Sequence, residues 1–457
     1  MTRVLFAQRI ATLLLSHALA LASCSPPVPH ATPVHATQSQ FTATVQPTSP
    51  PTATPCLPGY DDPEIVIEYR PPASTADWAI ADFDGDDLPD ILVARGEWQS
   101  PEDFPVEIYR NDGQGGLVNA SQAVIAGPIP RTQNPRGMAL ADFNGDGHMD
   151  VFIADTGDDR SPWPGYQNTL LLSRAGGGLI DATGNLPSQA DFTHSAAAAD
   201  VDNDGDSDIY VGNVHGRNRV PPMLLLNDGQ GRFSVASALL PAAQVDMNRN
   251  KYTTSLFADL NNDGFPDLVL GADDFTEDSV VLLNDGTGRL SLLPDAIPRK
   301  PHAATDIAIH IAAADLNSDG LMDLVLSWTK GDPFYQGRYI QVLINNSDAT
   351  FTDEKDARLP PQSFEDTYWW FRAVELTDPD EDGDLDILTH VVMDQVVYEN
   401  DGMGHFTVSN SLLPLPPIGH YALSDFDGDG HKDLIAIVPG ASDETAAFSI
   451  AWRTSCP

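Results

Sequence analysis

One acidic phrase recurs seven times along this chain of 457 residues. Its clearest copy is ADFNGDGHMD at 141–150, in which oxygen-bearing side chains occupy alternate positions and a further Asp follows. Counted from its first Asp, every copy has Asp at positions 1, 5 and 9 and Asp or Asn at position 3. The first residues run from Asp82 to Asp425, which is 343 residues over six intervals and a mean period near 57. Such a period indicates stacked or radially arranged supersecondary units.

The spacing of these oxygens predicts a calcium site in every loop, or up to seven Ca²⁺ ions. Side-chain oxygens at positions 1, 3, 5 and 9, with the carbonyl of position 7, can surround one hard cation, and calcium takes six to eight oxygen ligands. Zinc would require His or Cys at these positions. An EF-hand is excluded because position 12 is an apolar residue such as Val93 or Ile153, or at best Thr389, and never Glu. Acidic turns without an ion are the alternative, which seven matching copies disfavour.

The predicted ligands are the residues at positions 1, 3, 5 and 9 of the seven loops. They are Asp82, Asp84, Asp86 and Asp90; Asp142, Asn144, Asp146 and Asp150; Asp200, Asp202, Asp204 and Asp208; Asp259, Asn261, Asp263 and Asp267; Asp315, Asn317, Asp319 and Asp323; Asp378, Asp380, Asp382 and Asp386; Asp425, Asp427, Asp429 and Asp433. Position 6 is Gly in six loops, where the backbone must turn sharply, and Asp87 is the exception.

The residues around each loop predict a four-stranded unit. Short apolar runs precede and follow every loop, as in GMALA at 137 and VFI at 151, so each loop joins two strands. A second phrase, Asn-Asp-Gly-x-Gly, recurs downstream at 111, 227, 284 and 400, with weaker copies at 173 and 345. Asn-Asp-Gly favours a tight hairpin turn between a third and a fourth strand. Each unit is therefore predicted to be an antiparallel meander of the kind that forms a propeller blade.

Together the two phrases resemble the FG-GAP, or VCBS, repeat of bacterial surface proteins and the calcium loops of integrin α-subunit propellers. The resemblance covers roughly residues 60 to 457 and implies an all-β, seven-bladed β-propeller that binds calcium. It says little about activity, because proteins with these repeats are functionally diverse. Unit 2, which lacks Asn-Asp-Gly, and loop 1, which lacks its glycine, are the weakest matches.

The two ends of the chain are expected to close this ring. The last unit has only three strands, HYALS at 420, LIAIV at 434 and AFSIAW at 447. We expect EIVIEY at 64 to supply the fourth strand and so to cover the open sheet edge. Cys56 and Cys456 bracket the ring, and an exported protein can keep a disulfide, so we predict that they pair. Two free thiols are the alternative.

The N-terminus predicts export and anchoring. Arg3 and Arg9 precede an apolar run that is too short to span a bilayer permanently and that ends in LASC at 21–24. This tetrapeptide resembles the lipobox of bacterial lipoproteins, which implies a lipid on Cys24. Cleavage after Ala20 is the alternative and would leave Cys24 as a free thiol. Residues 25–58, rich in Pro, Thr and Ser, are predicted to be an extended linker before a propeller at 59–457.

These features place the chain at the cell envelope or surface, attached to the membrane through its lipid alone, or secreted if the lipid is absent. The formal net charge is −42, which makes nucleic acid an unsuitable partner. Apolar residues make up 42% of the chain and occur in short β-branched runs, which favours a folded protein over a disordered one.

The face opposite the calcium loops is the candidate ligand site. Residues five to seven positions before each loop should ring the mouth of the central channel, and they differ from unit to unit. The candidates, with two nearby Trp, are Asp77, Arg136, His194, Tyr252 with Thr254, His310, Trp369, Trp370, Arg372 and His420. Loops between second and third strands add Trp98, Phe104, Trp163, Tyr166, Trp328, Phe334 and Tyr335. Aromatic rings with Arg and His suit sugars or acidic polymers, although each ring could instead pack between blades.

We therefore expect a monomeric binding or adhesion module for a carbohydrate or protein ligand. A carbohydrate-active enzyme is the alternative, in which Arg136, His194, His310, Arg372 and His420 form a polysaccharide lyase-like site. The sequence carries no nucleophile elbow, phosphate loop or metal-hydrolase motif. A purely structural spacer is a third possibility.

Overall fold

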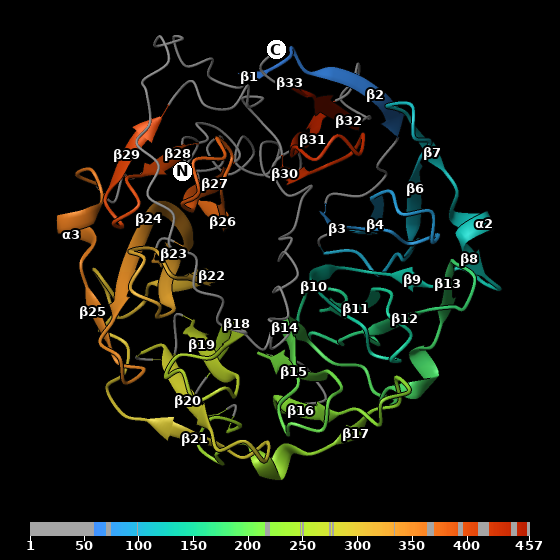
Figure 1. Ribbon diagram of the computed structural model, residues 1–457. Helices are drawn as coiled ribbons and strands as arrows, with labels where there is room; N and C mark the ends of the chain where they lie inside the picture. The colour runs from blue at the N-terminus through green and yellow to red at the C-terminus, as the bar shows by residue number, and fades with distance from the viewer. Residues whose placement is uncertain are drawn as a thin grey trace, which may run out of the picture.

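Seven sheets of four or five strands, each built on an antiparallel meander, are arranged around a common axis (Figure 1). The computed structural model describes residues 59–69, 75–97, 99–214, 220–246, 248, 251–273, 276, 278–332, 334–362, 370–391, 396–409, 420–439 and 446–454. Six of the sheets have four strands, and the sheet of blade 2 has five. The protein is thus an all-β, seven-bladed β-propeller, which confirms the predicted fold class.

Every blade has its first strand nearest the axis and its fourth at the rim (Figure 1). Blade 1 contains β3 (Thr75–Ala81), β4 (Asp90–Gly96), β6 (Glu107–Asn111) and β7 (Leu117–Asn119). Blade 2 contains β10 (Pro135–Ala141), β11 (Asp150–Asp155), β12 (Thr169–Ser173) and β13 (Leu179–Asp181). Blade 3 contains β14 (Thr193–Ala199), β15 (Asp208–Asn213), β16 (Met223–Leu226) and β17 (Ser234–Val235). Blade 4 contains β18 (Tyr252–Ala258), β19 (Asp267–Ala272), β20 (Val280–Asn284) and β21 (Leu290–Leu293).

The remaining blades follow the same order, and blade 7 takes its fourth strand from the N-terminal side. Blade 5 contains β22 (Ile307–Ala314), β23 (Asp323–Gly331), β24 (Phe334–Asn345) and β25 (Phe351–Asp353). Blade 6 contains β26 (Phe371–Thr377), β27 (Asp386–Val391), β28 (Val397–Asn400) and β29 (Phe406–Ser409). Blade 7 contains β30 (His420–Ser424), β31 (Asp433–Pro439), β32 (Ala446–Ala451) and β2 (Glu64–Tyr69).

Short elements connect or extend the blades. They are β1 (Gly59–Tyr60), β5 (Phe104–Pro105), β8 (Ile125–Ala126), β9 (Arg131–Thr132), β33 (Arg453–Thr454), α2 (Ser121–Val124), α3 (Lys355–Arg358), η1 (Thr183–Asn185) and η2 (Ser237–Leu239). Strand β8 adds a parallel fifth strand to blade 2, and β5 pairs with β9. Within the described ranges, no helix combines the length and the apolar character needed to cross a lipid bilayer.

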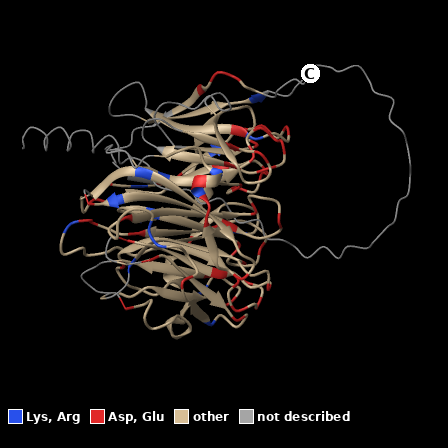
Figure 2. Cartoon of the chain, turned by 90° about the vertical axis from the view of Figure 1, so that its left-hand side faces the viewer, with Lys and Arg blue, Asp and Glu red and all other residues tan. Residues whose placement is uncertain are grey.

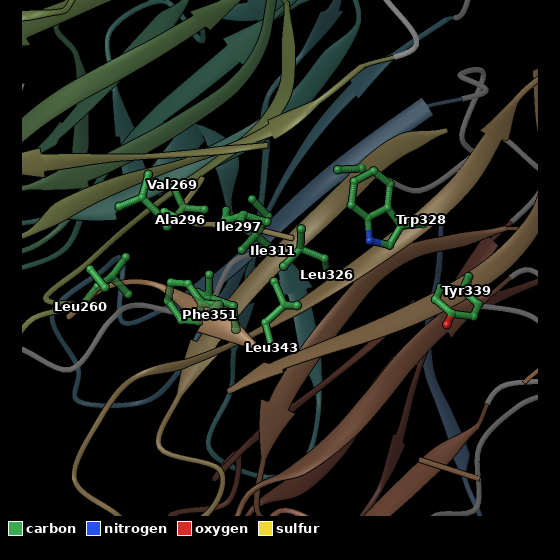
Figure 3. Close-up of a cluster of buried hydrophobic side chains, with 14 residues drawn as sticks. Leu260, Val269, Ala296, Ile297, Ile311, Leu326, Trp328, Tyr339, Leu343 and Phe351 are labelled. Carbon is green, nitrogen blue, oxygen red and sulfur yellow. The ribbon is translucent and has the colours of Figure 1, made fainter. Parts of the chain in front are cut away.

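The hydrophobic core is divided among the seven interfaces between neighbouring blades. Seven clusters of buried side chains are present, and each takes its residues from two adjacent blades. Figure 3 shows the cluster in which Leu260 and Val269 of blade 4 meet Leu343 and Phe351 of blade 5. Because both faces of each blade are covered, second strands such as β11 and β15 are buried along their whole length. A single blade could not bury these faces alone, so the ring is the folding unit.

The two ends of the described chain close the ring, as predicted. Strand β2 pairs antiparallel with β32, and Ile67 lies opposite Phe448. A second pairing, which the sequence did not reveal, joins β1 to β33 and places Gly59 opposite Thr454. The guanidinium of Arg453 also lies 4.9 Å from the centroid of the Tyr60 ring. Cys56 and Cys456 lie outside the described residues, so their disulfide stays a prediction, which the pairing of β1 with β33 supports.

Blade 2 approaches loop 1 so closely that one glycine cannot be replaced without strain. A Cβ atom at Gly177 would lie 1.8 Å from the carbonyl oxygen of Asp84, and Gly177 has a φ of +92°. Gly176 has nearly the same φ, +90°, but a Cβ there would meet nothing within 4 Å. We expect Gly177→Ala to lower the free energy of unfolding by about 3 kcal/mol and Gly176→Ala by about 1 kcal/mol. Urea unfolding measures both, and equal losses would show that the close approach does not occur.

Candidate calcium loops and the opposite face

The first Asp of each loop organises the loop backbone. In loop 1, Asp82 accepts hydrogen bonds from the backbone N–H groups of Gly85, Asp86 and Asp87 at 2.7, 3.2 and 2.9 Å. The first Asp of every other loop likewise accepts from the backbone of position 6. Positions 4 and 6 have positive φ in all seven loops. Asp87 adopts a φ of 67° where the other loops have Gly, so loop 1 keeps the shared conformation without its glycine.

The Asp at position 9 is buried and holds the loop against its own blade. Its Oδ1 atom accepts a backbone hydrogen bond from the end of the third strand, as Asp267 does from Asn284 at 2.9 Å. In six loops its Oδ2 atom accepts from the backbone N–H of position 2. Loop 6 differs because position 2 is Pro379, which has no N–H. Among the described residues, Asp386 Oδ2 consequently has no hydrogen-bond partner.

Each loop gathers crowded, partly buried carboxylates. Burial is the main cause that raises the pKa of Asp150, Asp267, Asp323 and Asp433 to about 6, of Asp90 and Asp208 to about 7 and of Asp386 to about 8. Neighbouring carboxylates of the same loops raise these pKa values further. The missing hydrogen bond from Pro379 accounts for Asp386 having the highest value. A bound cation would favour the ionised forms instead.

The donor set fits a hard cation such as calcium. In four loops, three carboxylate oxygens lie within 4.8 Å of one another, as those of Asp82, Asp84 and Asp86 do in loop 1. Oδ1 atoms of Asp84 and Asp202 are buried and have no hydrogen-bond partner among the described residues. Oxygens that converge in this way and lack donors are the ligands that calcium takes at about 2.3–2.6 Å. In these four loops, three of the four predicted ligands thus lie together, and the full ligand sets stay a prediction.

Each loop also accepts a hydrogen bond from the next blade at the carbonyl of position 2. The Asn that begins each Asn-Asp-Gly turn donates this bond, and the N···O distances are 2.7–3.0 Å in blades 1, 3, 4 and 6 and at Asn345 in blade 5. In blade 2, which lacks the Asn, the backbone N–H of Gly178 donates to Phe83 O at 3.1 Å. In blade 7, Arg453 donates to Pro379 O. The recurring Asn therefore joins neighbouring blades, a role that its place in a turn did not reveal.

On the opposite face, the first strands of blades 2 to 6 share a β-bulge. The pairing with the second strand shifts register six positions before the first Asp of each loop. The bulged residues are Arg136, His194, Thr253, Ile309 and Arg372. A bulge re-aims the side chain of its extra residue. We call the end of the first strands that carries these five residues the bulge face.

The predicted ligand residues divide into partly exposed and buried groups. Arg136, His194 and Arg372 are half-buried, and all three are bulged residues. Buried candidates are Asp77, Tyr252, Thr254, His310 and Trp370. Tyr252 packs in the core between blades 3 and 4, where its ring cannot stack on a ligand. Trp98 and Trp369 and the side chain of His420 lie outside the described residues.

Among the other aromatic candidates, Phe334 and Trp163 are 57% and 38% exposed. Phe104 and Trp328 are buried, and Trp328 belongs to the core between blades 4 and 5 (Figure 3). Its indole Nε1 donates to Gln341 Oε1 at 3.0 Å, which satisfies the buried N–H. Tyr166 donates its hydroxyl to Asp103 at 3.2 Å.

Two of the bulged arginines lie close enough to interact electrostatically. Burial and the positive charge of Arg136 lower the pKa of Arg372 to about 9, while Asp77 and Tyr335 act in the opposite direction. Arg136 forms an ion pair with Asp159, with 3.0 Å between Nη2 and Oδ2. Tyr335 was among the aromatic candidates predicted from the sequence, whereas nothing in the sequence indicated that Asp159 belongs to this neighbourhood.

Charge is distributed unevenly between the two faces. Figure 2 shows Asp and Glu gathered mainly along one side of the ring, and several Lys and Arg toward the middle and the other side. The two faces therefore differ in electrostatic potential.

Comparisons with known proteins agree with this architecture. Residues 82–153, 142–211 and 259–326 match the model of the FG-GAP-like repeat. Over 216 residues the chain is 28% identical to integrin alpha-V of Gallus gallus, which covers 45% of this chain and 20% of that protein. Over 175 residues it is 27% identical to cartilage acidic protein 1 of Mus musculus, which covers 37% of this chain and 25% of that protein. The matches thus span a quarter or less of the length of these relatives.

One solved structure with a similar fold is that of an Agrocybe aegerita lectin described as recognising non-reducing terminal N-acetylglucosamine. Its TM-score is 0.48 at 21% sequence identity, and the match covers 74% of this chain and 80% of that chain.

Proposed function

We propose that this seven-bladed β-propeller, parts of which match the FG-GAP-like repeat, is a calcium-loaded binding module. The acidic loops hold up to seven structural Ca²⁺ ions, and the bulge face binds a carbohydrate or protein ligand. The protein acts outside the cytoplasm, exported by its first 24 residues and attached through a lipid on Cys24. The FG-GAP-like repeats and the similarity to integrin alpha-V support a binding role.

The observation that carries this proposal is the contrast between the two faces. The calcium loops repeat one pattern of oxygens in every blade, whereas the bulged position changes from Arg136 to His194, Thr253, Ile309 and Arg372. A repeated scaffold with varied polar residues at one end is the arrangement expected of a binding surface.

An enzymatic role has less support. A lyase needs a base within hydrogen-bond reach of its substrate. His310, one of the three histidines of the lyase-like alternative, is 7% exposed, and burial lowers its pKa to about 4. The nearby side chain of His390 also lowers the pKa of His310.

The test compares two exposed apolar side chains on opposite faces. Phe334 lies in the long hairpin of blade 5, and Met403, which is 65% exposed, lies in the Asn-Asp-Gly turn of blade 6 beside the calcium loops. The full chain, purified in detergent with calcium, is screened against arrays of glycans and surface proteins. We expect Phe334→Ser to weaken binding of the retained ligand and Met403→Ser to leave it unchanged. Loss of binding in Met403→Ser alone would place the site on the calcium face and refute the proposal.

A further inference from the structure

Two arginines meet on the bulge face of a strongly acidic protein. The chain has 24 Lys and Arg against 66 Asp and Glu. Arg136 of β10 and Arg372 of β26 nevertheless occupy the same bulged position in their blades, and their charges repel each other across the axis. Strands β10 and β26 both lie next to the axis, on different sides of it (Figure 1). Like charges held near each other favour the binding of an anion between them.

Buried polar atoms without partners lie beside the arginines. Asp77 is fully buried; its Oδ1 accepts from the backbone of Trp78 at 3.0 Å, and its Oδ2 has no partner among the described residues. Arg136 Nε is likewise buried and without a hydrogen-bond partner in the part of the chain that the structure describes. Burial raises the pKa of Asp77 well above its usual value, which favours the protonated form of its carboxyl. A carboxyl oxygen and a guanidinium N–H, both buried and without hydrogen-bond partners among the described residues, therefore lie on the neighbouring strands β3 and β10.

The aromatic side chains of the β23–β24 hairpin lie near Arg372. Strands β23 and β24 are nine and twelve residues long, and their hairpin carries Phe334 and Tyr335. The Tyr335 ring lies 5.1 Å from Trp370 and 4.3 Å from Phe334, measured between ring centroids. Tyr335 also interacts electrostatically with Arg372. Exposed aromatic rings bind the apolar faces of sugar rings, as well as cations.

We propose that Arg136 and Arg372 bind the carboxylate of an acidic sugar, a uronate residue, whose ring packs against the aromatic side chains of the β23–β24 hairpin. Guanidinium groups bind carboxylates through paired, charge-assisted hydrogen bonds. The unpartnered Nε of Arg136 supplies a further donor. This inference rests on the proposed function, because it names the ligand class of the same face.

The net charge of the protein favours a sparsely charged ligand. A chain of −42 repels a dense polyanion that comes within roughly 8 Å of its surface charges at physiological salt. A glycan with isolated uronate residues avoids this repulsion and still supplies the anion. An acidic peptide supplies a carboxylate too, but it has no ring face for Phe334 and Tyr335 to contact.

The experiment measures binding of methyl β-D-glucuronoside to the full calcium-loaded chain by saturation-transfer NMR. The matched probes are its methyl ester, which lacks the charge, and triglutamate, which lacks the sugar ring. The variants are Arg136→Gln and Arg372→Gln, with Arg232→Gln as the control, because Arg232 is exposed in an Asn-Asp-Gly turn on the calcium face. Thermal unfolding of each variant verifies that it is folded.

We expect the glucuronoside to bind at least about tenfold more tightly than its ester, and each arginine variant on the bulge face to remove about tenfold of that affinity. Arg232→Gln should bind as the parent does. Equal binding of the ester, tighter binding of triglutamate, or unchanged affinity in Arg136→Gln would each overturn the inference. If the Phe334→Ser experiment locates a neutral ligand on the bulge face and the glucuronoside does not bind, the proposed function stands and only the uronate assignment fails.

Discussion

Chelation of calcium is expected to lower the free energy of unfolding of the purified chain by about 3 to 10 kcal/mol relative to 1 mM free calcium. The estimate takes seven independent loops with dissociation constants of about 10⁻⁴ to 10⁻³ M, which contribute about 0.4 to 1.4 kcal/mol each. The physical reason is the crowding of carboxylates, which repel one another in each loop until a divalent ion lies between them. Urea unfolding with calcium, with magnesium and with chelator measures the effect.

The pH dependence of the free energy of unfolding tests whether the crowded carboxylates cause the calcium effect. In the metal-free chain, burial raises the pKa of the seven position 9 carboxyls to between about 6 and about 8, against about 3.9 for Asp in an unfolded chain. The folded state therefore holds protons that the unfolded state releases, so metal-free stability should fall as pH rises from 4 to 8. Calcium binds the ionised carboxylates, so its stabilising effect should grow over that range. A calcium effect that is the same at pH 5 and at pH 8 would contradict this account.

Replacing Ile67 by Asp is expected to open the ring. Ile67 in β2 lies opposite Phe448 and packs into the cluster between blades 7 and 1. The substitution loses that burial and places a carboxylate against an apolar surface, which should cost about 4 kcal/mol. Because β2 is the fourth strand of blade 7, we also expect faster proteolysis at the ends of the chain.

Ile65 provides the matched control in the same strand. Its side chain is 56% exposed, so Ile65→Asp should change the free energy of unfolding by less than about 1 kcal/mol. Urea unfolding and limited proteolysis compare the two variants. Similar stability for both would mean that the N-terminal strand does not close blade 7.

The blades and their closure could be predicted because the relevant signals repeat or are local. Loop spacing gave the number of blades, and EIVIEY at 64–69 was the one strand left without a blade, so its partner followed by elimination. The acidic loops were equally accessible, since positions 1, 3, 5 and 9 are close in sequence, and their role as calcium ligands stays a prediction. Loop 1 and unit 2, the weakest matches, kept the shared geometry through Asp87 and Gly178.

The sequence predicted only part of the bulge face. Counting back from each loop found Arg136, His194 and Arg372, but strand alternation alone did not show which neighbours point into the core. A bulge shifts that alternation by one residue, which is why Tyr252 is buried while Thr253 is the bulged residue. The proximity of Arg372 to Arg136 and Tyr335 depends on the closed ring, because blades 2, 5 and 6 are far apart in sequence.

The pairing of the N-terminal strand β2 with β32 determines how the protein would respond to mechanical force. A tether at the N-terminus pulls at Gly59, so tension enters through β1 and β2, whose hydrogen bonds run to β33 and β32 at the opposite end of the chain. When the force acts along these strands, several of these hydrogen bonds must break at the same time. The contact between Arg453 and Tyr60 also opposes their separation. If the protein is anchored at its N-terminus, as proposed, the ring would open first where β1 and β2 pair with β33 and β32. The inner strands, which carry the bulge face, would stay folded until then.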